Sequence, residues 1–81
     1  MKPLHQLNPG ERAFIVDMKN PRLCEKLLDM GVFPGDLVVM KENNAEQKSI
    51  VVSINNRQYN IYRKAAETII TNTVSFEVNL N

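Results

Sequence analysis

The fold of this chain is decided by the stretch Leu27-Leu28-Asp29-Met30-Gly31-Val32-Phe33-Pro34-Gly35. Gly31 suits the left-handed residue that ends a helix, and Val32 beyond it supplies the apolar contact that accompanies such a cap. Pro34-Gly35 then forces a second turn. The stretch therefore predicts the end of a helix followed directly by a strand.

The residues before this stretch predict the helix itself. Asn20 is a good N-cap, and Pro21 suits the first helical position because its missing N–H has no partner there. Leu23, Leu27 and Met30 recur at spacings of four and three and form one apolar stripe. We expect an amphipathic helix over residues 21–30, lying on a core.

The rest of the chain has β character. A turn at Asn8-Pro9-Gly10 and a pair of turns at residues 43–46 and 55–56 separate runs rich in β-forming side chains. Residues 63–67 read as one helical turn. Strands are expected at residues 11–17, 36–42, 48–54, 57–62 and 68–71. One helix after the first strand and short turns elsewhere predict a mainly β fold, a small SH3-like five-stranded barrel.

The strand expected at residues 36–42 is apolar on both sides. Val38 and Met40 share one face of this strand, and Leu37 and Val39, on the other face, are apolar as well. We therefore expect both faces of this strand to be buried.

The last ten residues form a distinct segment. Val74, Phe76, Val78 and Leu80 alternate with polar residues, the cleanest period-two pattern in the chain. We expect residues 1–71 to form the barrel and residues 72–81 to extend the same domain by an extra C-terminal strand. Its apolar face would cover surface within the chain or across a homo-oligomer.

Length and charge restrict the function. The 81 residues suffice for one domain, and the net charge of +1 lacks the basic stripe of a nucleic-acid-binding protein. The longest apolar runs are four residues, which predicts no membrane insertion. The N-terminus has no secretory signal and Cys24 has no disulfide partner, so we expect a bacterial cytoplasmic protein.

Residues that could carry chemistry are few. His5 lies near a terminus, where a solvated side chain is the ordinary case, and Cys24 reads as a small apolar residue. Glu25 and Asp29 would share a helix face as ligands for a hard cation, but Arg22 and Lys26 offer each a local ion pair. Three methionines, at positions 18, 30 and 40, are too scattered for a soft-metal site. No enzyme is expected, no cofactor is required, and no metal ligands can be assigned.

The stretch from Leu27 to Gly35 also carries a family resemblance. The pattern Leu27-x-x-Met30-Gly31-x-x-Pro34-Gly35 follows Leu7-x-Pro9-Gly10-Glu11 and precedes Ala66-x-x-Ile69. Over residues 4–71 the chain resembles the ferrous iron transport protein A (FeoA) family. The resemblance implies an SH3-like fold and a non-catalytic accessory role in bacterial ferrous iron uptake, with the cytosolic GTPase region of the membrane transporter FeoB as partner. It also implies a place at the inner membrane through that partner, and an association with ferrous or other transition metals.

The helix end and the following loop are the candidate partner-binding surface. Its residues would be Leu28, Met30, Gly31, Phe33, Pro34 and Gly35. Phe33 is either an exposed anchor or a side chain that closes the end of the barrel. The alternative function is a small SH3-like barrel that binds nucleic acid, for which Arg57, Arg63 and Lys64 form the only local basic cluster.

Overall fold

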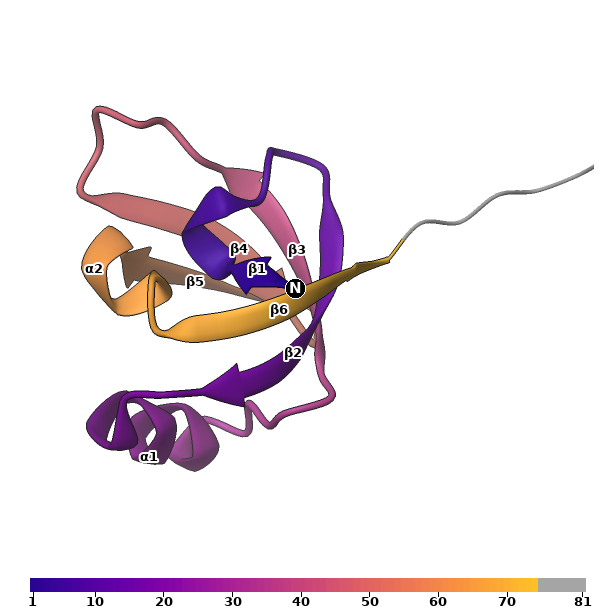
Figure 1. The fold of residues 1–81 in the computed structure, drawn as a ribbon, viewed down its shortest axis with the longest axis vertical. Helices are drawn as coiled ribbons and strands as arrows, with labels where there is room; N and C mark the ends of the chain where they lie inside the picture. The colour runs from indigo at the N-terminus through magenta and orange to yellow at the C-terminus, as the bar shows by residue number, and fades with distance from the viewer. Residues whose placement is uncertain (75–81) are drawn as a thin grey trace, which may run out of the picture.

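The structure is a computed structural model that describes residues 1–74. One antiparallel sheet has the strand order β1-β6-β2-β3-β4-β5 (Figure 1). Its strands are β1 (Lys2–Pro3), β2 (Arg12–Met18), β3 (Leu37–Glu42), β4 (Ser49–Ile54), β5 (Arg57–Tyr62) and β6 (Ile69–Val74). The helices are η1 (Leu4–Gln6), α1 (Pro21–Asp29) and α2 (Arg63–Ala66). No helix among these residues is long and apolar enough to cross a membrane.

The fold is mainly β and SH3-like, as predicted, but the expectation of a closed five-stranded barrel was wrong. Six strands form an open sheet whose edges are β1 and β5. The sheet does not close because β1 has only two residues, which pair with β6 before the chain turns into the 3₁₀ helix η1. Strand β1 therefore cannot reach β5 on the open side.

The extra strand lies at the N-terminus. Lys2 pairs with Thr71, and the Thr71 hydroxyl donates a hydrogen bond to the Lys2 carbonyl at 2.8 Å. Leu4 and Leu7, which follow β1, are fully buried in the core. The N-terminal residues therefore form part of the sheet and of the core.

Of the segment expected to form an extra C-terminal strand, only residues 72–74 are described. β6 continues to Val74, so residues 72–74 belong to the strand that was expected to end at residue 71. Phe76, Val78 and Leu80 lie outside the described residues.

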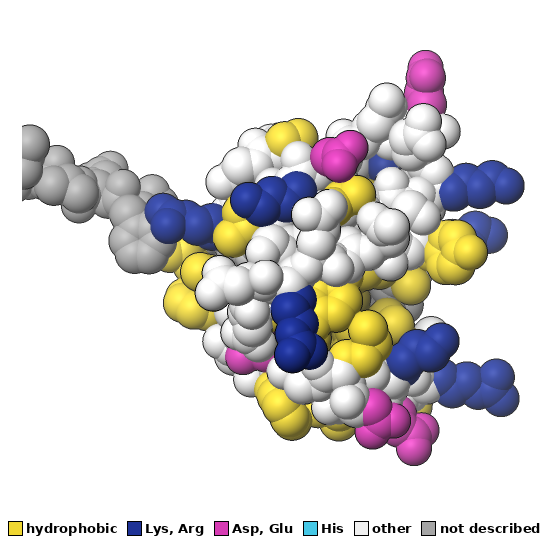
Figure 2. Space-filling model, turned by 180° about the vertical axis from the view of Figure 1, so that it is seen from behind, with side chains coloured by type: hydrophobic (Ala, Val, Ile, Leu, Met, Phe, Trp, Pro, Cys, Tyr) yellow, Lys and Arg dark blue, Asp and Glu magenta, His cyan; other side chains and the backbone are white. Residues whose placement is uncertain are grey.

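Both ends of α1 are as predicted. The Asn20 side chain accepts hydrogen bonds from the backbone N–H groups of Arg22 at 3.1 Å and Leu23 at 3.3 Å. At the other end, Gly31 has a φ of 83° and donates to the Leu28 carbonyl. Val32 donates to the Leu27 carbonyl, which completes a Schellman motif. Seen from behind, α1 forms the lower rim of the molecule (Figure 2).

The alternation of buried and exposed side chains along β2 changes at a β-bulge. Ile15 pairs with Thr71 and Asp17 with Ile70, so Val16 is the extra residue. Because of this extra residue, Met18 turns inward with Ala13 and Ile15. The sheet curves around the core at this position.

Only one face of β3 is fully buried. Val38 and Met40 point into the core, whereas Leu37 and Val39 are half-buried. The expectation that both faces are buried was therefore wrong for the outer face, where both side chains are only half-buried.

Candidate functional site

The loop after α1 is built around a tight turn. The N–H of Asp36 donates to the Phe33 carbonyl at 3.0 Å, and the N–H of Phe33 donates to Asp36 Oδ2 at 2.8 Å. Pro34 in second place and Gly35 in third, with a φ of 98°, are the signature of a type II turn. The two reciprocal bonds fix the shape of the loop.

Further hydrogen bonds attach this loop to the sheet. Gly35 donates to the Ile15 carbonyl at 2.7 Å, and Ile15 donates to the Asp36 carbonyl at 2.9 Å. Asn55 Nδ2, from the turn between β4 and β5, donates to Asp36 Oδ2 at 3.2 Å. Asp36 therefore links the loop to β2 on one side and to the β4–β5 hairpin on the other.

The rigid loop presents apolar side chains to solvent. Leu28, Met30 and Phe33 are 38%, 46% and 51% exposed, whereas neighbouring Leu27 and Val32 are buried. Phe33 is thus not part of the core, which favours the reading as an exposed anchor over the one that closes the barrel. The predicted residues Met30, Gly31, Phe33, Pro34 and Gly35 lie in the segment 30–35, which also contains buried Val32, and Leu28 lies two residues before it; we call these six predicted residues the loop surface.

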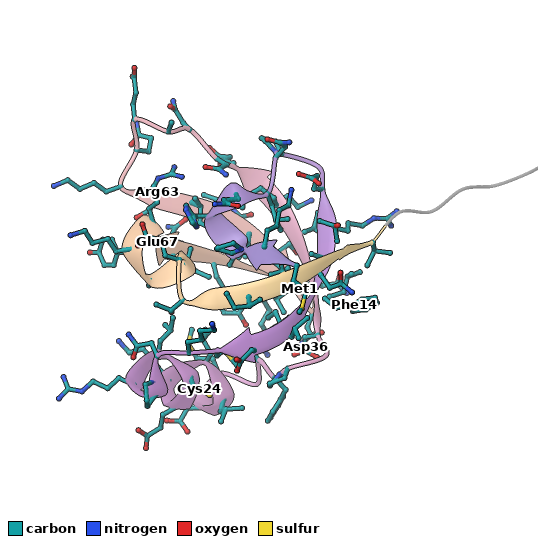
Figure 3. All side chains as sticks on the ribbon, in the orientation of Figure 1. Met1, Phe14, Cys24, Asp36, Arg63 and Glu67 are labelled. Carbon is teal, nitrogen blue, oxygen red and sulfur yellow. The ribbon has the colours of Figure 1, made fainter. Side chains whose placement is uncertain are left out.

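Two exposed apolar residues on β2 were not predicted from the sequence. Phe14 and Val16 are 43% and 44% exposed, and Phe14 pairs with Leu37 of β3. Figure 3 shows Phe14 pointing away from the body of the sheet. The signal that could have identified them is their alternation with Ala13 and Ile15, which are buried, because alternate residues of a strand face opposite sides of the sheet. Their strand is joined to the loop surface through Gly35 and Ile15.

The candidate metal ligands do not come together. Among residues 1–74, no group of three or more His, Cys, Asp or Glu side chains could hold a metal ion. Glu25 and Asp29 are exposed on α1, and half-buried Cys24 packs against the core. His5 is half-buried rather than solvated, and its Nδ1 atom has no hydrogen-bond partner among the described residues.

Of the three basic residues Arg57, Arg63 and Lys64, Arg63 has a structural role after the end of β5, whereas Arg57 lies at the start of that strand. Arg63 donates to the carbonyls of Gln47 and Asn44 at 3.1 and 2.6 Å, and to Asn43 Oδ1 at 2.8 Å. These bonds tie α2 to the loop between β3 and β4. The donors of Arg63 are thus directed at the protein, which weakens the nucleic-acid alternative.

Fold and surface together define a small SH3-like domain with an exposed apolar loop, and with no metal-ligand cluster among residues 1–74. The FeoA domain family matches residues 2–72, and the chain belongs to this family. The resemblance seen in the sequence is confirmed over nearly the same residues.

Solved structures agree with this assignment. The chain is similar to an iron uptake regulatory protein (FeoA), with 25% identity, a TM-score of 0.77, and coverage of 90% of this chain and 96% of that chain. It is similar to iron(II) transport protein A from Clostridium thermocellum, with 30% identity, a TM-score of 0.79, and coverage of 89% and 45%. It shares its fold with the FeoA protein from Chlorobium tepidum, with 22% identity, a TM-score of 0.83, and coverage of 96% and 75%. No curated protein matches the sequence.

Proposed function

We propose that this protein is a non-catalytic accessory protein of bacterial ferrous iron transport, which contacts the cytosolic GTPase region of the transporter FeoB through its loop surface. Membership of the FeoA family supports a role associated with ferrous iron transport. The related structures are an iron uptake regulatory protein and an iron(II) transport protein. In this role the protein is cytoplasmic and reaches the inner membrane through its partner.

The observation that carries the proposal is the exposure of Phe33 on a loop fixed by hydrogen bonds. An aromatic side chain that is 51% exposed offers a partner a large apolar area. Because Asp36 and Gly35 already hold the loop in one shape, little conformational entropy is lost when a partner binds. Such preorganised aromatic anchors dominate the energy of many protein interfaces.

The proposal is tested by calorimetry with the purified cytosolic region of FeoB, with and without a guanine nucleotide. We expect Phe33→Ala to weaken binding at least about 10-fold, the loss typical of an anchor residue. Tyr62→Ala is the matched control, because Tyr62 is also an exposed aromatic residue but lies on β5. If the wild-type protein fails to bind in either nucleotide state, the partnership with FeoB is wrong. If Phe33→Ala binds as tightly as the wild type, the loop surface is not the contact.

The same experiment tests the part played by metal. We propose that contact with FeoB does not require a metal ion bound to the accessory protein, since residues 1–74 bring no three ligands together. Affinity should then be equal in the presence of Fe²⁺ and of a chelator. An affinity that depends on Fe²⁺, with the metal bound to this chain alone, would contradict this part of the proposal.

A further inference from the structure

A small hollow lies beside the loop surface. Its lining consists of Met30 and Gly31, which belong to the loop surface, and of Asn55, Arg57 and Tyr59 from the β4–β5 hairpin. Its volume of about 290 Å³ is at the lower limit for small-molecule sites, which suits one inserted side chain better than a larger ligand. We call this feature the Arg57 hollow. A partner that covers Met30 and Gly31 also reaches it.

Arg57 is the one charged residue in the lining, and its charge has no partner in the described part of the chain. The side chain is exposed, and it makes no hydrogen bond or ion pair with any of residues 1–74. The carboxylate of Asp36 accepts hydrogen bonds from the Phe33 N–H and from Asn55 instead. The hollow therefore offers a positive charge that residues 1–74 do not neutralise.

Two further polar groups line the hollow with Arg57. The Tyr59 hydroxyl has no hydrogen-bond partner among residues 1–74. The Asn55 amide nitrogen donates to Asp36 Oδ2, and its second N–H is left for another acceptor. The lining thus combines three hydrogen-bond donors with the apolar side chain of Met30. Such a lining suits a carboxylate, which an arginine binds through two parallel hydrogen bonds.

Hydrogen bonds hold both sides of the hollow in place. Gly31 has a φ of 83°, and its N–H donates to the Leu28 carbonyl at 3.0 Å. On the hairpin side, Asn55 has a φ of 54° and is bound to Asp36 at 3.2 Å. Asp36 also accepts from the Phe33 N–H, so the hairpin and the loop surface are fixed to each other. A ligand in the hollow therefore has little of its lining left to order.

We propose that the partner of the loop surface inserts an acidic side chain, aspartate or glutamate, into the Arg57 hollow. Its carboxylate pairs with the Arg57 guanidinium, and apolar residues beside it in the partner contact Phe33 and Met30. A nucleic-acid phosphate fits less well, because Arg57 is the only cation in the lining and the net charge of the chain is +1. This inference rests on the proposed function for the identity of the partner, the FeoB cytosolic region.

Calorimetry with the FeoB cytosolic region tests the ion pair. We expect Arg57→Gln to weaken binding about 10-fold, as the loss of an anchor residue does, without changing thermal unfolding. Arg57→Lys should lose part of the affinity, because an ammonium group keeps the charge without the planar fork. Lys64→Gln is the matched control, since it removes the same charge from an exposed position beyond the other end of β5.

The salt dependence gives a second readout of the same pair. Rising ionic strength should weaken the wild type more steeply than Arg57→Gln, because only the wild type loses an attraction between charges at this position. Equal affinities of Arg57→Gln and Lys64→Gln, or equal salt dependence of Arg57→Gln and the wild type, would overturn the proposal.

A titration without FeoB separates failure of this proposal from failure of the proposed function. The probes are N-acetylglutamate N-methylamide and its uncharged glutamine counterpart, followed at millimolar concentration through the NMR signals of Arg57 Nε–H and Gly31 N–H. We expect shifts with the glutamate probe alone, and loss of the Gly31 shift in Arg57→Gln. If these shifts appear but the FeoB region does not bind, the partner is wrong and the hollow is still a carboxylate site. An equal response to the two probes would overturn the carboxylate site whatever the partner.

Discussion

Arg63 Nη1 donates a hydrogen bond of 2.8 Å to Asn43 Oδ1, which joins α2 to the loop after β3. The same Asn43 side chain donates from Nδ2 to the carbonyls of His5 and Leu7, at 2.8 and 2.7 Å. One amide thus connects the first turn of α2, the loop after β3 and the N-terminal η1. Strands β1 and β5 do not pair with each other. These side-chain hydrogen bonds instead connect the segments that follow the two edge strands, η1 and α2.

We expect Asn43→Ala to lower the free energy of unfolding by about 1–3 kcal/mol, because it leaves the half-buried carbonyls of His5 and Leu7 and one Arg63 donor without their partner. Urea unfolding measures the effect. Lys64→Ala is the control, since Lys64 is an exposed neighbour in α2. Equal stability of the two variants would show that the Asn43 bonds contribute nothing to the fold.

A second prediction concerns Gly31, which has a φ of 83° and an open space around its Cα. Gly31→Ala should cost about 1–2 kcal/mol, the strain of a left-handed residue that carries a Cβ. Gly31→Asn should cost less, because asparagine tolerates this conformation better. Thermal unfolding of the two variants gives the comparison, and an alanine variant as stable as the wild type would mean that α1 ends in another way.

The pH dependence of stability should change with Glu11. Its carboxylate accepts a hydrogen bond from the Asn8 backbone N–H at 2.6 Å and lies 3.4 Å from Lys2 Nζ. These interactions, the Asn8 bond first, lower the pKa of Glu11 below its ordinary value of 4.5. A lowered pKa stabilises the folded state above pH 4.5, and the contribution disappears as the pH falls through the folded pKa.

Urea midpoints of the wild type and of Glu11→Gln, measured over this range, provide the test. The wild type should be more stable at neutral pH, and the two curves should meet in acid. A difference that stays constant from neutral pH into acid would mean that the ionisation of Glu11 is not involved.

Substitutions at two adjacent loop residues, Val32 and Phe33, should affect stability and partner binding differently. Val32 is fully buried and Phe33 is 51% exposed. Val32→Ala should lower the free energy of unfolding by about 2 kcal/mol, from lost burial and the cavity left behind. Phe33→Ala should change it by less than about 0.5 kcal/mol, as at most surface positions. Affinity for the FeoB cytosolic region should show the reverse order, and a large stability loss in Phe33→Ala would place this side chain in the core instead.

The elements predicted well from the sequence have local signals. Asn20-Pro21 and Gly31 mark the two ends of α1 with caps that need only neighbouring residues. Asn55-Asn56 marks its hairpin because both residues tolerate a positive φ. Pro34-Gly35 likewise marks its turn, but the exposure of Phe33 did not follow from these local rules, which left open whether this side chain is an exposed anchor or closes the end of the barrel.

The features that were missed depend on partners far away in the sequence. Lys2 and Pro3 have no strand pattern, and they pair only because Thr71 and Ile70 lie opposite. The bulge at Val16 is likewise a property of the pairing between β2 and β6 rather than of β2 alone. The number of strands and the open edge of β5 could not be predicted while these long-range pairs were unknown.

The hydrogen bond from the Thr71 hydroxyl to the Lys2 carbonyl has a consequence for how the chain is made, because the residues are 69 positions apart. On the ribosome, Lys2 emerges well before Thr71 and lacks this hydrogen-bond partner until β6 has left the exit tunnel. Leu4 and Leu7 also wait for the rest of the core, so apolar N-terminal residues remain open to chaperones throughout synthesis. The N-terminal residues can therefore reach their native packing only after β6 has been translated, and such long-range pairing slows folding.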